Sequence, residues 1–260
     1  MLFVLQRDKY IDYLNIDSMI AQTVINESRG FHSFINMDYK ELFIGHNPMK
    51  GILKNKDSFS TQIQKAIPIG TLEFTGAFMK IFHGINDPIP IEVPLVLRNE
   101  NFLKRKYEFY DYEDLPNNGY VFLKDVTVPK FMSYCGEIST LRNKRKLSRN
   151  HKYLVSEVIP NILSEYRTYV VRGEILGICF YKGNPLVYCD TELIKEAVDI
   201  YSNQEDAPKS YTLDVMVSDR GTSIIEIHNF MAVGLYSCWW DNRLLDAYID
   251  GFNYLLKHHV

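Results

Sequence analysis

The sequence lacks long hydrophobic runs, a marked excess of charge of either sign and internal repeats. No stretch of the 260 residues approaches the roughly 18 consecutive apolar residues of a membrane span, and the opening residues lack the apolar length of a signal peptide. The net charge of −3 gives no global field that would attract nucleic acid or an anionic membrane. We therefore expect a cytoplasmic protein with no membrane partner, for which nucleic acid is an unfavoured ligand.

Cysteine is scarce, and its spacing excludes the common cysteine motifs. The four cysteines are Cys135, Cys179, Cys189 and Cys238, and no pair has the two-residue gap of a zinc knuckle or a redox motif. The pattern is typical of a reduced chain with incidental thiols. The sequence also shows no signature of a serine, cysteine or histidine catalytic triad.

Hydrophobic periodicity divides the chain into two unlike parts. Apolar and alternating runs predict strands at residues 1–6, 42–44, 120–124 and 152–159, and hairpins at 166–181 and 210–227. Helical spacing predicts helices at residues 16–27, 191–201 and 244–257. The first part is mixed, whereas the second is mostly antiparallel sheet with one helix between two hairpins. This order is typical of an α+β fold rather than a doubly wound parallel sheet.

We place the predicted domain boundary between residues 115 and 116. Residues 1–115 then form a mixed N-terminal subdomain, and residues 116–260 form the C-terminal domain. Within the first predicted helix, four apolar residues share one face, which we expect to be buried: Ile16, Met19, Ile20 and Val24.

Two carboxylates lie inside apolar strands of the second hairpin. Asp214 precedes Ser218 by four residues, and Glu226 follows Gly221 by five, so the two can face each other across the hairpin. A carboxylate in a buried strand is costly unless it is paired or binds a cation. Two converging carboxylates with no obvious internal cation indicate a hard divalent ion such as Mg²⁺. The alternative is that both face solvent on the polar side of an amphipathic hairpin.

Basic residues between 124 and 149 are candidates for phosphate contacts. Lys124 ends an apolar strand, where it can present a point charge to a phosphate oxygen, and Lys130 lies just downstream. Strand-end lysines are commonly solvated instead. The basic stretch at residues 142–149 is either a solvated loop or a flap that closes over phosphates or an acidic partner. No aromatic ladder of the kind that binds single-stranded nucleic acid adjoins it.

Glu165 and Arg167 stand two residues apart and therefore share one face of a predicted strand. Arg167 can contact a phosphate while Glu165 orients it or another cation. A structural cross-strand salt bridge is an equally good interpretation, and the residue types alone do not decide between the two.

Five segments, taken in order, resemble an ATP-grasp domain, and in particular the divergent ATP-grasp clade found in phage and bacterial genomes. The segments are FLKDVTVPKF at 122–131, VSEVI at 155–159, SEYRTYVVRGEILG at 164–177, YTLDVMV at 211–217 and IIEIHNFMAVGLY at 224–236. Their order and spacing carry the resemblance. It implies an ATP-grasp fold, ATP and Mg²⁺ as cofactors, and an N-terminal region that supplies much of the acceptor site.

The resemblance also implies roles for individual residues. Lys124 resembles the strand lysine that contacts ATP phosphates, and Lys130 resembles a second cationic position. Arg167 resembles a strand arginine that faces the phosphates or the acyl-phosphate. Asp214 and Glu226 resemble the two metal carboxylates.

The adenine would lie at a hinge between the two lobes. Glu157, Val158 and Ile159 resemble this hinge, where the backbone meets the adenine edge and Glu157 takes the amino group or a ribose hydroxyl. Glu165 and Lys182 complete the residues that we expect to bind ATP. Lys182 stands where related chains often carry arginine, and it lacks the planar fork that holds a carboxylate in a bidentate way.

One position departs from the family pattern at the metal. The family usually has Asn two residues after the second carboxylate, but this chain has His228 there, followed by Asn229. Histidine can donate a hydrogen bond or bind a metal. Alternatively, a strand bulge would let Asn229 take the role. The nearby Gly234-Leu235-Tyr236 segment lies either near the acceptor site or in a simple loop before the last helix.

The implied reaction is transfer of a phosphoryl group from ATP to a carboxylate, followed by attack of an amine or thiol. The acceptor is expected to be a small molecule, a peptide or a protein, with peptides or proteins favoured by the clade. Two alternatives remain open: a phosphotransferase of the same fold, and a non-catalytic ATP-binding or assembly protein, which His228 in place of Asn favours.

Overall fold

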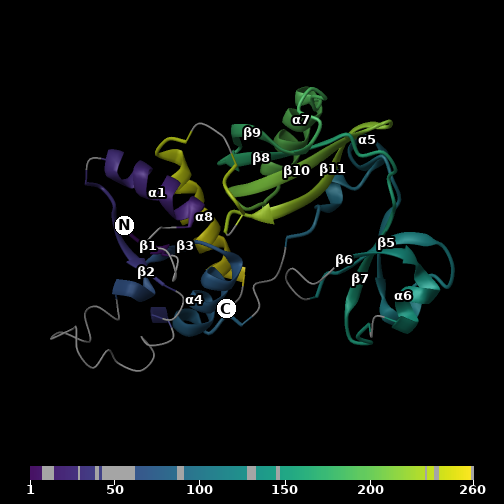
Figure 1. Cartoon of the computed structure of the whole chain (residues 1–260), viewed down its shortest axis with the longest axis horizontal. Helices are drawn as coiled ribbons and strands as arrows, with labels where there is room; N and C mark the ends of the chain where they lie inside the picture. Colours follow the sequence, from purple (N-terminus) through teal and green to yellow (C-terminus); the bar gives the residue numbers. More distant parts are fainter. Residues whose placement is uncertain are drawn as a thin grey trace.

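The computed structural model contains three sheets, which form three groups of elements in Figure 1. The N-terminal group lies at the left of that view, the β8–β11 sheet lies at the top, and the sheet with β5, β6 and β7 lies at the right. The structure describes residues 1–7, 15–28, 30–38, 41–42, 62–86, 91–127, 133–144, 147–231, 233–236 and 240–258.

The N-terminal group is a small parallel sheet with helices packed on it. Its strands, in spatial order, are β2 (Ser33–Met37), β1 (Leu2–Gln6) and β3 (Ile67–Ile69). The helices are α1 (Ile16–Glu27) and α4 (Leu72–His83). The side chain of Asn15 caps the start of α1 and that of Thr71 caps the start of α4, because each accepts a hydrogen bond from a backbone N–H of the first turn.

The second sheet is antiparallel and carries the predicted phosphate lysine and the hinge. Its order is β4 (Tyr107–Asp111), β7 (Lys152–Glu157), β5 (Tyr120–Asp125) and β6 (Ser133–Glu137), with α6 (Ile138–Lys144) after β6. Short helices precede it or follow β4: η1 (Leu95–Leu97), α5 (Glu100–Leu103) and η2 (Tyr112–Asp114). The predicted boundary at 115/116 falls between β4 and β5, two strands of this one sheet.

The third sheet is the antiparallel pair of hairpins that the sequence predicts. Its order is β11 (Gly221–Asn229), β10 (Ser210–Ser218), β8 (Ser164–Val171) and β9 (Glu174–Gly183), and α7 (Thr191–Ser202) joins the hairpins. Arg172 and Gly173, with φ of 51° and 81°, form the two-residue turn between β8 and β9. The α+β prediction is confirmed.

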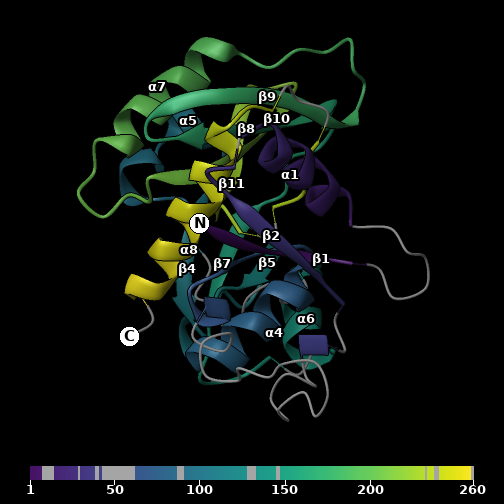
Figure 2. The same ribbon diagram turned by 90° about the vertical axis from the view of Figure 1, so that its left-hand side faces the viewer.

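The last helix joins the N-terminal group to the third sheet. Leu244, Tyr248 and Phe252 of α8 (Arg243–His258) belong to the same buried cluster as Phe3 of β1 and Tyr169 of β8. Figures 1 and 2 show α8, in yellow, between the two sheets. A second cluster fills the space between the third sheet and α7, and a third lies under α6.

The structure corrects some predictions from the sequence. Ile16 and Met19 are exposed, whereas Asp17 and Ser18 are buried, because the Ser18 hydroxyl donates to the Ile69 carbonyl and the Asp17 carboxylate accepts from the Leu235 N–H. Leu42 is helical rather than extended. Residues 43 and 44 of the predicted strand lie outside the described residues. Of the cysteines, Cys135 and Cys189 are free, but Cys179 is disulfide-bonded, so the prediction of incidental thiols is wrong there.

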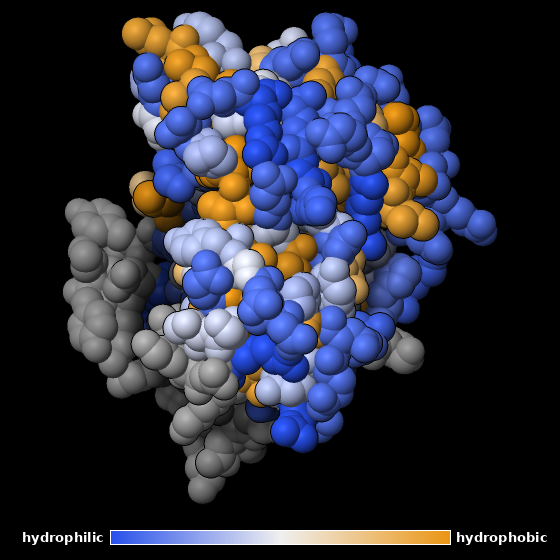
Figure 3. Space-filling model, turned by 90° about the vertical axis from the view of Figure 1, so that its right-hand side faces the viewer, coloured by the Kyte–Doolittle hydropathy of each residue, from blue (hydrophilic) through white to orange (hydrophobic). Residues whose placement is uncertain are grey.

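The surface carries no functional argument of its own. Among the described residues drawn in colour in Figure 3, hydrophobic side chains form separate patches between hydrophilic ones. Scattered apolar side chains of this kind are normal on a protein surface. Within the described part of the chain, no helix combines the length and apolar character needed to cross a membrane.

Candidate functional site

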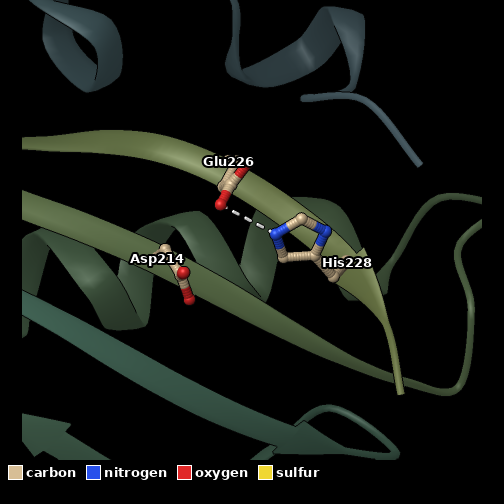
Figure 4. Close-up of side chains that lie close together, drawn as sticks. All are labelled: Asp214, Glu226 and His228. Atoms are coloured by element: carbon tan, nitrogen blue, oxygen red, sulfur yellow. Dashed lines mark ion pairs between the residues drawn. The ribbon is translucent and has the colours of Figure 1, made fainter. Parts of the chain in front are cut away.

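Asp214, Glu226 and His228 meet on one side of the β10–β11 hairpin (Figure 4). Asp214 and Glu226 are direct cross-strand neighbours, as the hairpin register predicts. Their unequal distances from the turn are reconciled by a bulge between Asp214 and Val215, where β11 holds one extra residue, Ile225. Each of the three side chains offers a ligand atom, and these atoms lie within 4.8 Å of one another.

Asp214 is held by Arg167 of the neighbouring strand. The two residues are paired across β8 and β10, and Arg167 donates from Nε and Nη2 to the two carboxylate oxygens, each at 2.8 Å. Burial raises the pKa of Asp214, and the hydrogen bonds from Arg167 oppose that rise. Burial lowers the pKa of Arg167, but Asp214 outweighs this effect and the pKa is raised overall. The pair therefore resembles a structural cross-strand salt bridge.

Glu226 lies in a different environment, with cations on both sides. His228 Nε2 is 2.8 Å from Glu226 Oε1, and Lys124 Nζ is 3.8 Å from Glu226 Oε2. Burial raises the pKa of Glu226, but His228, Lys124 and Arg167 lower it by more, to about 2. Lys124 also lies 3.2 Å from Glu92, an acid that the sequence analysis did not identify. The structure thus brings the predicted lysine opposite the predicted carboxylates.

A cavity of about 190 Å³ separates the second and third sheets at this point. Lys124 and Glu226 lie in its wall, together with the apolar side chains of Phe122, Leu154 and Met216. The predicted hinge residues line it too, namely Glu157, Val158 and Ile159. An apolar chamber with a few charged groups is the usual form of a small-molecule site.

Arg105 ties the two sides of the cavity together. Its Nε donates to the Ser156 hydroxyl on β7 at 3.0 Å, and its Nη1 and Nη2 donate to the carbonyls of Ile224 and Ile225 at 2.7 and 3.3 Å. Arg105 therefore holds the β11 bulge, next to Glu226, against the hinge strand. The sequence analysis missed this residue because Lys104 and Lys106 flank it, and a run of basic residues is typical of a solvated surface.

Glu165 lines the cavity but does not orient Arg167. Its carboxylate accepts from Tyr181 Oη at 2.8 Å and from Lys182 Nζ at 2.5 Å. The predicted partnership between Glu165 and Arg167 is wrong, because the guanidinium turns toward Asp214 instead. Glu157 also has a cationic neighbour outside the site, since Arg220 Nη2 is 2.6 Å from its Oε1, and this hydrogen bond lowers the pKa of Glu157.

The structure decides between His228 and Asn229. Between Glu226 and Asn229 the register is regular, because the bulge lies on the other side of Glu226. Strict alternation then keeps His228 on the same face as Glu226. Asn229 instead donates from Nδ2 to the Gly251 carbonyl of α8 at 3.1 Å. The alternative in which a bulge presents Asn229 to the metal is therefore wrong. Lys130, the second predicted phosphate lysine, lies outside the described residues.

The 234–236 segment packs beside Arg167. Gly234 has a φ of 68°, which favours glycine. Tyr169 Oη donates to the Gly234 carbonyl at 2.8 Å and accepts from the Tyr236 N–H at 2.9 Å. The Tyr236 ring stacks on Tyr181, with centroids 5.1 Å apart, and lies 5.3 Å from the Arg167 guanidinium carbon. The segment is therefore part of the surroundings of the site rather than a simple loop.

The basic stretch at 142–149 is partly anchored. Arg142, in α6, donates to the carbonyls of Tyr112 and Leu115 at 3.2 Å and lies 5.1 Å from the Tyr112 ring centroid. This arginine serves the packing of its own sheet. Residues 145 and 146 are outside the described residues.

Comparison with known proteins agrees with this architecture. A family model described as an ATP-grasp domain, the second family of its clade, matches residues 102–244, more than half of the chain. No curated protein matches the chain. D-alanine–D-alanine ligase from Bacillus anthracis complexed with ATP is similar at 12% identity and a TM-score of 0.47, covering 100% of this chain and 98% of that chain. ATP-grasp ligase PsnB complexed with minimal precursor is similar at 10% identity and a TM-score of 0.48, covering 96% and 98%.

A third solved structure extends the comparison. Macrocyclase MdnC bound with precursor peptide MdnA, from Microcystis aeruginosa MRC, is similar at 11% identity and a TM-score of 0.43, covering 96% of this chain and 99% of that chain. These similarities are remote, whereas the family match is direct and includes β4–β11, the hinge and all three residues of the carboxylate–histidine group. The chain therefore belongs to this ATP-grasp domain family and has the α+β ATP-grasp fold.

Proposed function

We propose that the protein is an ATP- and Mg²⁺-dependent ligase that activates a carboxylate as an acyl-phosphate and joins it to an amine or a thiol. The observation that carries this proposal is the cavity between the two antiparallel sheets of an ATP-grasp domain, with an apolar hinge in its wall and Lys124 opposite Glu226. The ATP would be drawn from the cytoplasm, and the acceptor is a small molecule, a peptide or a protein.

The cavity would take the nucleotide with its base at the hinge. The backbone of residues 157–159 would meet the adenine edge, and Phe122 and Leu154 supply apolar surface for the ring. Lys124 would exchange its present partners, Glu92 and Glu226, for phosphate oxygens. Lys130 remains the proposed second cation.

The carboxylate–histidine group suits a divalent cation. Asp214 and Glu226 provide the oxygen ligands that Mg²⁺ prefers, and Glu226 is ionised because its pKa is about 2. Asp214 keeps lone pairs for a cation, because each of its oxygens accepts one hydrogen bond from Arg167. When bound, the ion supplies neutralisation of the phosphate charge as it develops.

The remaining residues act by position and fixed charge. An acyl-phosphate is itself the activated species, so no nucleophile of the protein is required. Lys124 would hold phosphate oxygens in place, and Arg105 would keep the two cavity walls at a fixed separation through Ser156 and Ile224. Residues 1–115 would contribute much of the acceptor site, next to the 234–236 segment that Asp17 holds.

A non-catalytic nucleotide-binding protein is the second candidate. The observation that favours it is the bidentate contact of Arg167 with Asp214, which occupies both oxygens of one proposed metal ligand. Such a protein would bind ATP tightly and release no ADP with any acceptor.

ADP release distinguishes the two candidates. The purified protein would be assayed with Mg-ATP against amino acids and peptides that carry free carboxylates and amines, with and without each acceptor. We expect acceptor-dependent ADP release that falls by about 100-fold in Glu226→Gln, the scale seen when one charge-stabilising group is removed. Glu174→Gln is the matched control, since Glu174 is an exposed acid on β9 of the same sheet. Tight ATP binding without turnover would reject the ligase proposal.

A further inference from the structure

The histidine at position 228 gives the two carboxylates a nitrogen neighbour. The side chains of Asp214, Glu226 and His228 come from adjacent strands and converge in Figure 4. Because the register places Glu226 and His228 two residues apart on one strand, the pairing of β10 and β11 sets their spacing. The ligand set is therefore two carboxylate oxygens and one imidazole nitrogen within 4.8 Å of one another.

We propose that this group is a cation site that prefers a divalent transition-metal ion to Mg²⁺, and that His228 is the residue that sets this preference. The inference rests on the proposed function for its setting, because the cation would lie beside the phosphates of ATP. It concerns the identity of the ion, which the family match leaves open.

The preference follows from the chemistry of the ligands. Mg²⁺ takes oxygen ligands, keeps several of its waters and gains little from imidazole. Imidazole suits first-row transition metals, whose affinities for a mixed nitrogen and oxygen site rise along the series from Mn²⁺ to Cu²⁺. An asparagine at position 228 would offer a carbonyl oxygen and leave the site to oxygen-seeking ions. A histidine there tilts the same site toward metals that accept nitrogen.

The three side chains are accessible to an ion in different degrees. Exposed fractions are 35% for the Glu226 side chain and 27% for that of His228, so both can be reached from solvent. Asp214 is buried and would contribute from beneath. His228 Nε2 now faces Glu226 Oε1 at 2.8 Å, so an ion placed between them would replace a hydrogen bond rather than break packing.

Another histidine provides a matched control. His151 Nδ1 lies 2.6 Å from Asp125 Oδ2, and its side chain is 26% exposed, close to the value for His228. Only the group around His228 brings a second carboxylate within reach among the described residues. A metal effect specific to His228 would therefore not be shared by His151.

Cobalt titration tests the proposal without reference to activity. The full chain, stripped with a chelator, would be titrated with Co²⁺ and followed by visible absorption, which changes when nitrogen enters the coordination shell, with Mg²⁺ as competitor. We expect Co²⁺ to bind at least about tenfold more tightly than Mg²⁺, and His228→Asn to lower Co²⁺ affinity about tenfold while changing Mg²⁺ affinity less than about threefold. His151→Asn should leave both affinities unchanged.

The contrary result is equally defined. Unchanged Co²⁺ affinity and spectrum in His228→Asn, or equal affinities of the wild-type protein for Co²⁺ and Mg²⁺, would overturn the proposal. Circular dichroism verifies folding, and His228→Gln replaces the asparagine variant should that one not fold. ADP release with Mg²⁺ separates the two proposals: release that survives while His228 proves irrelevant to Co²⁺ rejects only the metal preference, whereas Co²⁺ bound through His228 without any ADP release rejects only the ligase.

Discussion

Two ionic groups on the third sheet are cross-strand neighbours but differ in their surroundings. Asp214 is 1% exposed and has both oxygens bound by Arg167. The Glu226 side chain is 35% exposed, lines the cavity and shares its charge with His228 and Lys124. The buried pair is closed by its own partners, whereas the group at the cavity is only loosely paired. The comparison teaches that the position of a carboxylate, and not its presence in an apolar strand, separates a structural charge from one available to a ligand.

Removing one member of the buried pair should have the largest effect on stability. Asp214→Ala leaves the Arg167 guanidinium buried without a counter-charge, and we expect it to lower the free energy of unfolding by about 3–5 kcal/mol. Glu226→Ala should cost less than about 1 kcal/mol, because Lys124 keeps Glu92 and the site is partly solvated. Urea unfolding of the two variants measures the contrast.

A paired substitution sharpens this prediction. Replacing both residues, as Arg167→Met with Asp214→Leu, removes the uncompensated charge and should recover most of the stability lost by Asp214→Ala. Equal losses in Asp214→Ala and Glu226→Ala would mean that the two environments do not differ as described.

A second prediction concerns the contact between the N-terminal group and the site. The buried Asp17 carboxylate accepts from the Leu235 N–H at 2.8 Å. Asp17→Leu leaves that N–H without its partner and should cost about 1–3 kcal/mol, the usual penalty for a lost buried acceptor. Asp17→Asn keeps an acceptor oxygen and should cost less. Thermal unfolding of both variants is the measurement, and a larger loss for Asn than for Leu would contradict the assigned hydrogen bond.

The sequence predicts the parts of the fold that are governed by local patterns. Alternating apolar residues define the hairpin that pairs Asp214 with Glu226, and the turn at residues 218–221 sets its register to within the single extra residue Ile225. The helix at 191–201 is likewise specified by its spacing and ends one residue later in the structure. These elements need no information from distant segments.

The features that escaped prediction depend on partners far away in the chain. The buried face of α1 is set by Asp17 and Ser18, whose partners are the Leu235 N–H and the Ile69 carbonyl. Arg105 is important because of carbonyls in β11, more than a hundred residues later. No pattern within a few residues of either position reports such contacts.

The smallest predicted effect is a pH dependence at Glu226. Its pKa is about 2 in the folded protein against an ordinary value of 4.5. A carboxyl group whose pKa is lowered by folding contributes stability that is fully present above pH 4.5 and is lost as the pH falls to about 2. The difference in stability between the wild-type protein and Glu226→Gln should therefore shrink from pH 5 toward pH 2, which urea unfolding at several pH values would show. A constant difference would contradict the stated ionisation of Glu226.

The central claim is that the cavity between the second and third sheets holds a nucleotide between Lys124 and Glu226. The most direct measurement is a crystal structure of the protein with a non-hydrolysable ATP analogue and a divalent cation. The account predicts the base against residues 157–159, phosphate oxygens at Lys124, and the cation at Glu226 and His228, with the Arg167–Asp214 pair intact. A nucleotide bound elsewhere, or a cation that leaves Glu226 and His228 in contact with each other, would contradict it.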